Sequence, residues 1–349
     1  MNTFFCLVVL CISCVSRATA ASPQAELVSV QKIWDRAPHN GFTDLIRFHD
    51  QFFCCFREGL DHVGGDGVIR ILSSKDGGHW TDEAAITEAG SDLRESKLAI
   101  TPDGARLYMS CEASIYGGTK VLRARHTSYA TSTDGRVWTP TRTILGEGDL
   151  LWRVVVNPAD KKLHGITGNI WPATGGPTPE EHWTLATCSS TDGSDYQPGT
   201  VLQVPGQPCQ PTLRFLTDGR AMALVRRDDG DRSGMIGTAA PPYRDWQWTT
   251  IPTRIAGPNF IELPDGTLIA GSRGFGKTNA DTHVVLSRMT ATSLDPILKL
   301  PGGGSDCGYT GLVWHDDILW VTYNSTHEGR TCVYLARVRL PGIGTPRPK

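Results

Sequence analysis

The sequence lacks several features that mark common classes of protein. It has no excess of positive charge, since 34 Lys and Arg residues stand against 36 Asp and Glu residues, and a nucleic-acid-binding protein would usually be basic. After residue 20 no apolar run is long enough to cross a bilayer. The same part of the chain has no Cys-x-x-Cys pair, which argues against a structural zinc site. We therefore expect no nucleic-acid partner, no membrane span, no metal and no cofactor.

Residues 1–20 form a segment of their own, in which Lys and Arg are also scarce. The apolar run "FFCLVVLCISCV" is too short to span a membrane, and "ATA" at 18–20 has the small-x-small form of a cleavage site. We predict a secretory signal peptide cut after Ala20 and a secreted or periplasmic protein. A lipid anchor at Cys14 is the less favoured alternative, because Cys11 stands where a branched apolar residue is expected.

Seven cysteines remain after residue 20, at positions 54, 55, 111, 188, 209, 307 and 332. An odd number leaves at least one unpaired. Adjacent Cys54 and Cys55 on one strand would point to opposite faces. We expect most of these cysteines to be small apolar residues of a core, and their pairing stays open.

Glycine is abundant, with 38 residues, and one glycine turn is repeated. The copies read "SKDGGHW" (74–80), "STDGRVW" (132–138) and "STDGSDY" (190–196). Asp-Gly is the strongest short hairpin signal, and the glycine can take the positive φ of a tight turn. Each copy therefore predicts a β-hairpin whose aromatic residue folds back over neighbouring strands. Together with many short apolar runs, this favours an all-β fold.

A second turn recurs more often, and it sets the number of repeats. Its markers are Asp50, Asp103, Asp160, Asp218, Asp265 and Asp316, which lie 53, 57, 58, 47 and 51 residues apart. A period near 50 with several strands per period is typical of a β-propeller, so six periods predict six blades. The last period lacks a fourth strand, and we expect "ELVSVQKIW" (26–34) to supply it and close the ring. This gives one domain over 22–341, followed by a Pro-rich tail over 342–349.

In each blade of such a ring, the first strand begins on one face of the propeller, around the central channel. The loop between the second and third strands of the blade lies on the same face. That face gathers many charged and aromatic residues, and one interpretation is a solvated rim with ion pairs between blades. Converging arginines around one mouth instead predict an anionic ligand. The candidate ligand-binding residues are Asp44, Arg57, His62, Arg94, Arg153, Arg226, Arg273 and Tyr323.

The "STDGRVW" turn resembles the Asp-box of sialidases, and six blades match their fold. The resemblance covers essentially the whole chain after residue 20. It implies a secreted, monomeric glycoside hydrolase that removes a terminal anionic sugar, such as sialic acid, with retention. It places Tyr309 of "GYTGLVW" as the nucleophile, with Arg226 and Arg273 binding the sugar's carboxylate. Asp66 would be the general acid, with Asp61 as the alternate.

Two positions depart from the sialidase pattern. Thr43 stands where the first carboxylate-binding Arg should be, and Gln210 stands where a carboxylate should activate the Tyr. A phenol with a pKa of ~10 needs such a base at neutral pH. We expect Glu328 or Glu58 to supply it, and Arg57, Arg94 or Arg153 to replace the missing Arg.

These departures leave three interpretations open. The first is a sialidase-type hydrolase, whose turnover a Gln210→Glu variant should raise. The second is a catalytically inactive glycan-binding propeller, which Gln210 and Thr43 favour. The third is a protein-binding scaffold, against which the ring of arginines argues. The sugar and its linkage are not determined by the sequence.

Overall fold

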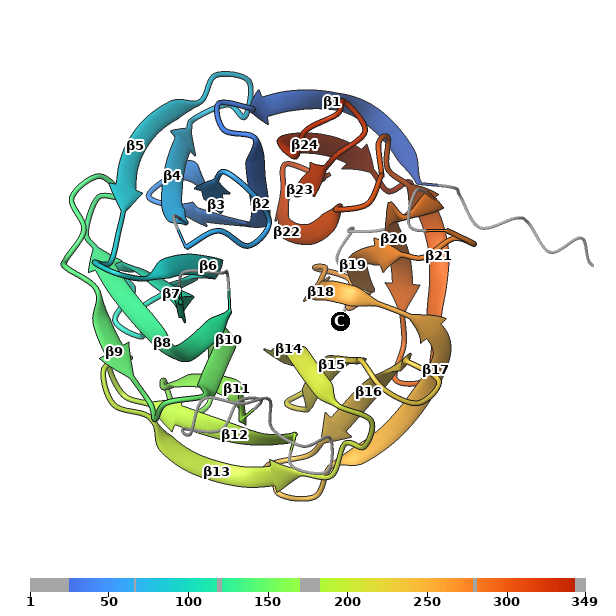
Figure 1. The fold of residues 1–349 in the computed structure, drawn as a ribbon. Coiled ribbons are helices and arrows are strands. Elements are labelled where there is room, and N and C mark those ends of the chain that lie inside the picture. The colour runs from blue at the N-terminus through green and yellow to red at the C-terminus, as the bar shows by residue number, and fades with distance from the viewer. Residues whose placement is uncertain (1–24, 66, 118–120, 170–182, 279–280, 343–349) are drawn as a thin grey trace, which may run out of the picture.

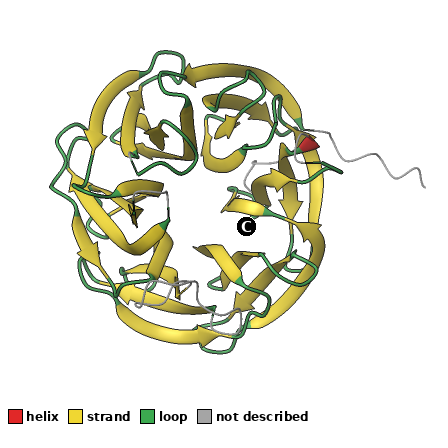
Figure 2. Ribbon diagram, viewed as in Figure 1, coloured by secondary structure: helices red, strands yellow, loops and turns green. Residues whose placement is uncertain are grey.

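The computed structural model describes residues 25–342, except residue 66 and residues 118–120, 170–182 and 279–280. The predicted signal peptide lies outside the described residues, as does the predicted tail apart from Gly342. The named elements of the described residues are all strands, and Figure 2 shows one short helical segment beside them. None of the described helical segments is long and apolar enough to span a membrane.

Six four-stranded antiparallel sheets are arranged in a ring (Figure 1). The innermost strands line a central channel with residues such as Leu45, Leu98, Val154 and Leu312. Blade one contains β2 (His39–Phe48), β3 (Gln51–Gly59), β4 (Val68–Ser74) and β5 (Thr81–Ile86); blade two contains β6 (Asp92–Ile100), β7 (Leu107–Tyr116), β8 (Leu122–Ser132) and β9 (Arg142–Ile144). Blade three contains β10 (Asp149–Val156), β11 (Leu163–Asn169), β12 (Thr184–Ser190) and β13 (Gln197–Leu202); blade four contains β14 (Pro208–Phe215), β15 (Ala221–Arg227), β16 (Ser233–Ala239) and β17 (Gln247–Arg254). Blade five contains β18 (Ala256–Glu262), β19 (Leu268–Gly274), β20 (His283–Met289) and β21 (Leu294–Lys299). The prediction of six blades is confirmed.

Blade six joins the two ends of the chain. It contains β22 (Gly308–His315), β23 (Ile318–Ser325), β24 (Cys332–Arg339) and, as its outer strand, β1 (Glu26–Trp34). β1 pairs antiparallel with β24 and places Val30 opposite Ala336. Leu27 and Val30 pack against the apolar core of blades five and six. The prediction that an N-terminal strand closes the ring is therefore confirmed, and β1 pairs with the side of β24 that would otherwise be the edge of a three-stranded blade.

The repeated turn has one hydrogen-bond pattern in the copies at 74–80 and 132–138, shown here for residues 132–138. Ser132 Oγ accepts a 2.8 Å hydrogen bond from the Gly135 amide, and Asp134 Oδ1 accepts from the two amides that follow. Trp138 Nε1 donates back to the Gly135 carbonyl at 3.0 Å. The copy at 190–196 shares the bonds to Ser190 and Asp192, but there Tyr108 of the preceding blade donates to the glycine carbonyl. The serine and aspartate oxygens thus satisfy the amides of a turn that would otherwise expose them.

The glycine of this turn makes a contact between blades. Gly135 has φ +76°, and a Cβ built there would lie 2.1 Å from the Phe53 ring of blade one. Gly77 lies equally close to Trp320, and Gly193 to Tyr108. At each copy, an aromatic ring of the preceding blade packs onto the turn glycine. This shared contact between blades explains why the turn is repeated.

The innermost strand of every blade carries a β-bulge at the same place. In each case two residues stand opposite one residue of the next strand. The first bulge residue has positive φ in five blades: Phe42, Glu95, Gln210, Gly257 and Tyr309. Positive φ is uncommon for residues other than glycine, and bulges re-aim side chains. The bulges thus direct these residues differently from the rest of their strands.

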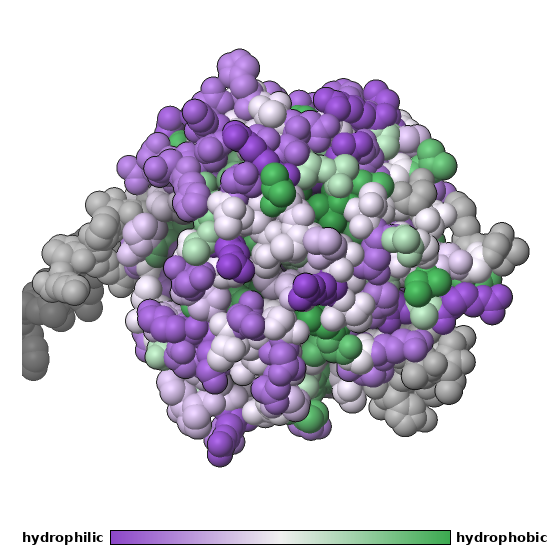
Figure 3. Space-filling view, turned by 90° about the vertical axis from the view of Figure 1, so that its left-hand side faces the viewer, coloured by the Kyte–Doolittle hydropathy of each residue, from purple (hydrophilic) through white to green (hydrophobic). Residues whose placement is uncertain are grey.

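All seven described cysteines are free and buried. This confirms the expectation that they act as apolar core residues. They lie in the packing between and within blades rather than in cross-links. The surface shown in Figure 3 is mostly polar, with scattered apolar residues.

Candidate functional site

Three side chains from different blades meet at the mouth of the channel. Gln210 on β14 donates from Nε2 to the Tyr309 hydroxyl at 3.0 Å and to Glu95 Oε1 at 2.8 Å. The Tyr309 hydroxyl lies 3.5 Å from the same Glu95 oxygen. All three are first bulge residues, so the shared backbone irregularity brings blades two, four and six together at one point.

The orientation of the Gln210 amide fixes the direction of the phenol proton. Gln210 Oε1 accepts from the Gly257 amide at 2.9 Å and from Arg226 Nη1 at 3.0 Å, so its NH₂ group must face the other way. That NH₂ group donates to the Tyr309 oxygen. The phenol therefore directs its own hydrogen to Glu95, which can only accept when ionised.

The electrostatic surroundings of Tyr309 oppose ionisation at rest. Burial and the Glu95 charge raise the pKa of Tyr309 above its ordinary value, while Arg273 and Arg226 offset part of this increase. The Lys97 ammonium also lies 5.8 Å from the phenol ring centre. The phenol thus stays protonated, beside a carboxylate that can take its proton.

Arg226 and Arg273 flank the phenol from blades four and five. Arg226 donates from Nε to Asp228 at 2.7 Å, and Arg273 donates from Nη2 to Asp306 at 2.8 Å and from Nε to the Cys307 carbonyl. Among the described residues no hydrogen bond involves Nη2 of Arg226 or Nη1 of Arg273. Each guanidinium is positioned by protein groups and keeps one end available to a ligand.

Blade one contributes an aromatic ring where an arginine was expected. Phe42 packs edge-on against Tyr309, with ring centres 4.7 Å apart, and Arg94 lies 5.0 Å from the Phe42 ring. Thr43 is fully buried and donates from Oγ1 to the Tyr309 carbonyl at 2.5 Å. Thr43 therefore supports the backbone of Tyr309 and does not face a ligand.

A second cluster lies beside the phenol. Asp306 Oδ2 is 2.7 Å from His39 Nε2 and 2.8 Å from His62 Nδ1, and Oδ1 accepts from Arg273. These groups could in principle hold a metal ion, since their ligand atoms lie within 4.8 Å of one another. However, Arg57 and Arg94 approach the remaining nitrogens of the two histidines. Three guanidinium groups add positive charge where a cation would bind, so the arrangement favours a hydrogen-bonded network.

Several residues predicted to bind a ligand form buried ion pairs instead. Arg57 is fully buried and makes two hydrogen bonds to Asp92, at 2.6 and 3.0 Å. Arg153 Nη1 lies 2.8 Å from both oxygens of Asp44, and both residues are buried. These pairs connect blade one to blades two and three. The interpretation as ion pairs between blades is the correct one for Arg57, Asp44 and Arg153.

Three further predictions are corrected by position. Tyr323 is fully buried and donates to the Pro301 carbonyl at 2.9 Å, so it cannot face a ligand. Glu328 accepts from Lys32 at 2.8 Å and Tyr334 at 2.7 Å, next to the outer strand β1. Glu58 accepts from Trp34 Nε1 and from Arg70 Nε. Both carboxylates are therefore engaged away from Tyr309.

The predicted general acid, Asp66, lies outside the described residues, but its neighbours are described. The amides of Gly64 and Gly65 donate to Asp92, and the Gly67 carbonyl accepts from the Leu93 amide. The loop on both sides of position 66 is thus bound to the start of β6, the strand that carries Glu95. The alternate acid, Asp61, accepts from the His62 amide at 2.8 Å.

The structure brings Arg226, Arg273, Gln210 and Tyr309 close together. Arg94 and His62 lie beside them, next to the Phe42 ring. No role was predicted from the sequence for Glu95, Phe42 or Asp306. Aligning the innermost strands on their bulges would have identified Glu95 and Phe42, because each occupies the position of Tyr309. Asp306 carries no such signal, because it precedes β22 in a glycine-rich loop.

Comparison with known proteins shows a shared fold with low sequence identity. No family model matches the sequence. No curated protein has significant sequence similarity to it. A sialidase from Trypanosoma rangeli, solved with the inhibitor DANA, is similar over 91% of this chain, with 11% identity and a TM-score of 0.68. The chain spans 60% of that sialidase.

Two other solved structures have the same fold. An α-L-arabinofuranosidase from Fusarium graminearum, in complex with an iminosugar inhibitor, matches 90% of this chain and 98% of its own length, with 15% identity and a TM-score of 0.67. The NanB sialidase from Streptococcus pneumoniae matches 86% of this chain and 68% of its own, with 11% identity and a TM-score of 0.65. The chain therefore has the sialidase-like six-bladed propeller fold.

Proposed function

We propose that the protein is a retaining glycoside hydrolase in which Tyr309 is the nucleophile and Glu95 is the base that activates it. One observation carries the proposal: the Gln210 amide, oriented by Gly257 and Arg226, leaves the phenol hydrogen directed at Glu95. The base expected from blade four is thus replaced by one from blade two. The six-bladed fold shared with solved glycoside hydrolases is consistent with this activity.

In the first step the Tyr309 oxygen bonds to the anomeric carbon and its proton passes to Glu95. The bond from that carbon to the leaving oxygen breaks, and the general acid protonates the leaving group. Asp66 is retained as this acid from the resemblance. Water then attacks the anomeric carbon of the glycosyl-tyrosine, and its proton passes to Asp66, which the first step left deprotonated. The bond from that carbon to the Tyr309 oxygen breaks, Glu95 returns its proton to that oxygen, and the sugar leaves with its original configuration.

A terminal sugar with a carboxylate is the substrate class that the charges favour. A carboxylate nucleophile would be repelled by such a sugar, whereas a phenol stays neutral until it attacks. The available ends of Arg226 and Arg273 can bind the sugar's carboxylate. The proposal retains secretion and a monomeric state as sequence-based predictions.

Hydrolysis of aryl glycosides tests the proposal. We expect turnover of an aryl α-sialoside, with an aryl α-L-arabinofuranoside as a neutral comparison. Tyr309→Phe should abolish turnover, and Glu95→Gln should lower kcat by about 10²–10⁴-fold, as expected for loss of a general base. Ligand binding should persist in both variants. Full activity of either variant would refute the assigned roles.

A non-catalytic glycan-binding propeller remains the second candidate, and one observation favours it. Tyr309 is only 6% exposed, and the Phe42 ring covers part of it. A protein that binds free sialic acid yet releases no aryl leaving group from any tested glycoside would establish this alternative. Phe42→Ala should then leave turnover absent, whereas in a hydrolase it should alter KM.

A further inference from the structure

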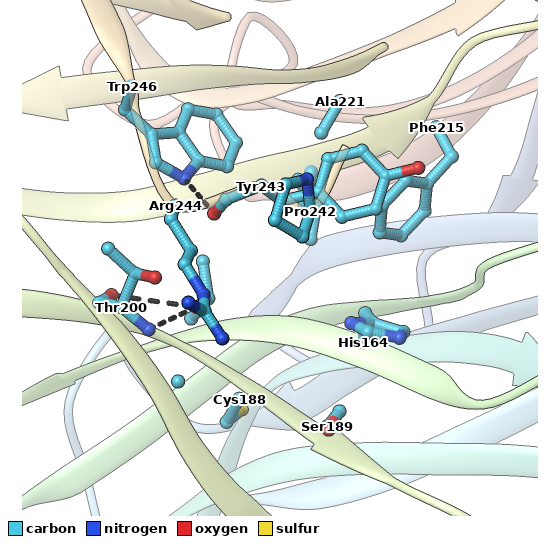
Figure 4. A pocket seen from close by; sticks show the side chains of 13 residues that line it. His164, Cys188, Ser189, Thr200, Phe215, Ala221, Pro242, Tyr243, Arg244 and Trp246 are labelled. Atoms are coloured by element: carbon cyan, nitrogen blue, oxygen red, sulfur yellow. Dashed lines mark hydrogen bonds between the residues drawn. The ribbon is translucent and has the colours of Figure 1, made fainter. Parts of the chain in front are cut away.

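A cavity of about 370 Å³ lies between blades three and four, away from Tyr309 (Figure 4). Phe215 contributes to it from the last residue of β14, whereas Gln210 lies five residues earlier on the same strand. Five extended residues span about 16 Å. The cavity is therefore separate from the proposed catalytic site, and it opens near the turns between the first and second strands.

The cavity exists because one contact between blades is missing. In blade four the sequence "APPYRDW" replaces the Ser-x-Asp-Gly turn. Trp246 Nε1 still donates to the carbonyl three residues back at 3.0 Å, as Trp138 does. Tyr243 thus holds the position of Gly135, and its φ is +64°.

The partner residue on the preceding blade is changed as well. In β7, Leu107 pairs with Ser132, and Tyr108 is the next residue. In β11, Leu163 pairs with Ser190, and His164 is the next residue. His164 therefore holds the place of the ring that packs onto the turn glycine elsewhere. A smaller imidazole on one side and a redirected Tyr243 on the other leave an open space.

Aromatic rings form one wall of this space. Phe215 packs edge-on against both His164 and Tyr243, with ring centres 5.1 and 5.0 Å apart. Trp246 lines the cavity near Tyr243, and Trp248 stacks behind it at 5.7 Å. Such rings can stack on the C–H face of a sugar, much as aromatic rings gather in other ligand sites.

Polar groups line the rest. Ser189 of β12 and Thr200 of β13 line the cavity with hydroxyl-bearing side chains. Thr187 also lines it, but its Oγ1 is hydrogen-bonded to the amide and the carbonyl of Thr200. Arg244 extends from the turn toward these strands (Figure 4), and the structure records no hydrogen bond or ion pair between it and another described residue. The two dashed lines that end beside Arg244 in Figure 4 join Thr200 to Thr187 Oγ1. An exposed guanidinium beside stacked rings fits a carboxylate on a cyclic polar molecule.

We propose that this cavity is a second glycan-binding site, separate from the channel mouth, which takes an acidic monosaccharide unit. The rings stack on the sugar, the hydroxyl groups of Ser189 and Thr200 bind its hydroxyl groups, and Arg244 binds its carboxylate. The site does not depend on catalysis at Tyr309. It would hold the protein on a glycan while the other face acts on a chain end.

Binding isotherms of the full chain test the site. The probes are N-acetylneuraminic acid and glucuronic acid, with galactose as a neutral sugar and inorganic sulfate as a charge without a ring. Arg244→Ala should weaken binding of the better acidic sugar at least tenfold. His164→Tyr should abolish binding at this site, because it restores the ring present at the equivalent junction and fills the cavity.

Arg136→Ala is the matched control, because Arg136 follows Gly135 as Arg244 follows Tyr243. Arg136→Ala should bind the acidic sugar like the wild type. Any binding at the channel mouth should be the same in the wild type and the three variants, so differences among their isotherms report on the cavity. Hydrolysis of a small aryl glycoside should be unchanged in His164→Tyr. If the isotherms of Arg244→Ala and His164→Tyr both coincide with that of the wild type, the proposal of a second binding site is wrong. This result does not depend on whether the protein hydrolyses glycosides. Equal binding of galactose or sulfate overturns the assignment to an acidic sugar.

Discussion

Thr43 in the first blade donates a 2.5 Å hydrogen bond to the backbone carbonyl of Tyr309 in the last. The two ends of the propeller are therefore joined directly behind the phenol. Because the bond reaches the bulge that re-aims Tyr309, it links the closure of the ring to the geometry of the site.

Thr43→Val should weaken this link without changing the shape of the side chain. The Tyr309 carbonyl would lose a buried partner, which costs about 1–3 kcal/mol. Urea denaturation would measure the loss of stability. Kinetics on the same variant should show a lower kcat, because the phenol would be less well positioned; an unchanged kcat would mean that other contacts are sufficient to hold Tyr309.

Gln210→Glu should lower turnover by at least tenfold, contrary to the expectation from the resemblance alone. The new carboxylate would place an oxygen where Nε2 now lies 2.8 Å from Glu95. Two carboxylates at that distance share a proton, so Glu95 would lose its capacity as a base. A rise in kcat/KM would instead show that Glu95 does not serve as the base.

Trp34→Ala tests closure of the ring by β1. Trp34 is 6% exposed, packs 5.6 Å from the Phe56 ring of blade one and donates to Glu58. Its truncation should cost about 3–5 kcal/mol in urea denaturation. Val28 on the same strand is 37% exposed, so Val28→Ala is the control and should change stability by less than about 0.5 kcal/mol. Equal effects of the two variants would contradict closure by this end of β1.

Asp306 gives the protein a pH-dependent contribution to stability. Burial by itself raises the pKa of this carboxyl group, but hydrogen bonds from His39 and His62 and the charge of Arg273 outweigh burial and hold it well below its ordinary value. A lowered carboxyl pKa stabilises the fold above the ordinary value of about 4, and this stabilisation is lost as the pH falls below it. Asp306→Asn should therefore be less stable than the wild type at pH 7, and the difference should narrow at pH 3. A constant difference would assign the effect to packing.

The cysteines should be unreactive in the folded protein. Burial raises the pKa of the Cys55 and Cys188 thiols to about 12, and the thiolate is the reactive form. A thiol reagent at pH 8 should modify none of the seven described cysteines in the native state and all seven after denaturation. Rapid native labelling of any of them would indicate local opening of a blade.

The blades could be predicted from the sequence because their signals are local. The residues that form a turn such as 132–138 are neighbours in the sequence, and the turn is repeated along the chain. The last blade lacked a fourth strand, and residues 26–34 were an unassigned segment that could supply it. The site depends on contacts between distant blades, which have no such local signal. Glu95 could be taken for a rim residue until the bulge directed it to Gln210, and Glu328 was misassigned because its loop leads outward to Lys32.

The bulges also have a consequence for how propellers of this kind can diverge. Each one changes the direction of a single side chain while the pairing on either side of it continues, so that side chain can be replaced with little effect on the sheet. In this chain the five residues with positive φ, read in blade order, are Phe, Glu, Gln, Gly and Tyr. Proteins too distant for ordinary alignment could be grouped by this short string, and two chains with the same string should share chemistry even where their outer strands have nothing in common.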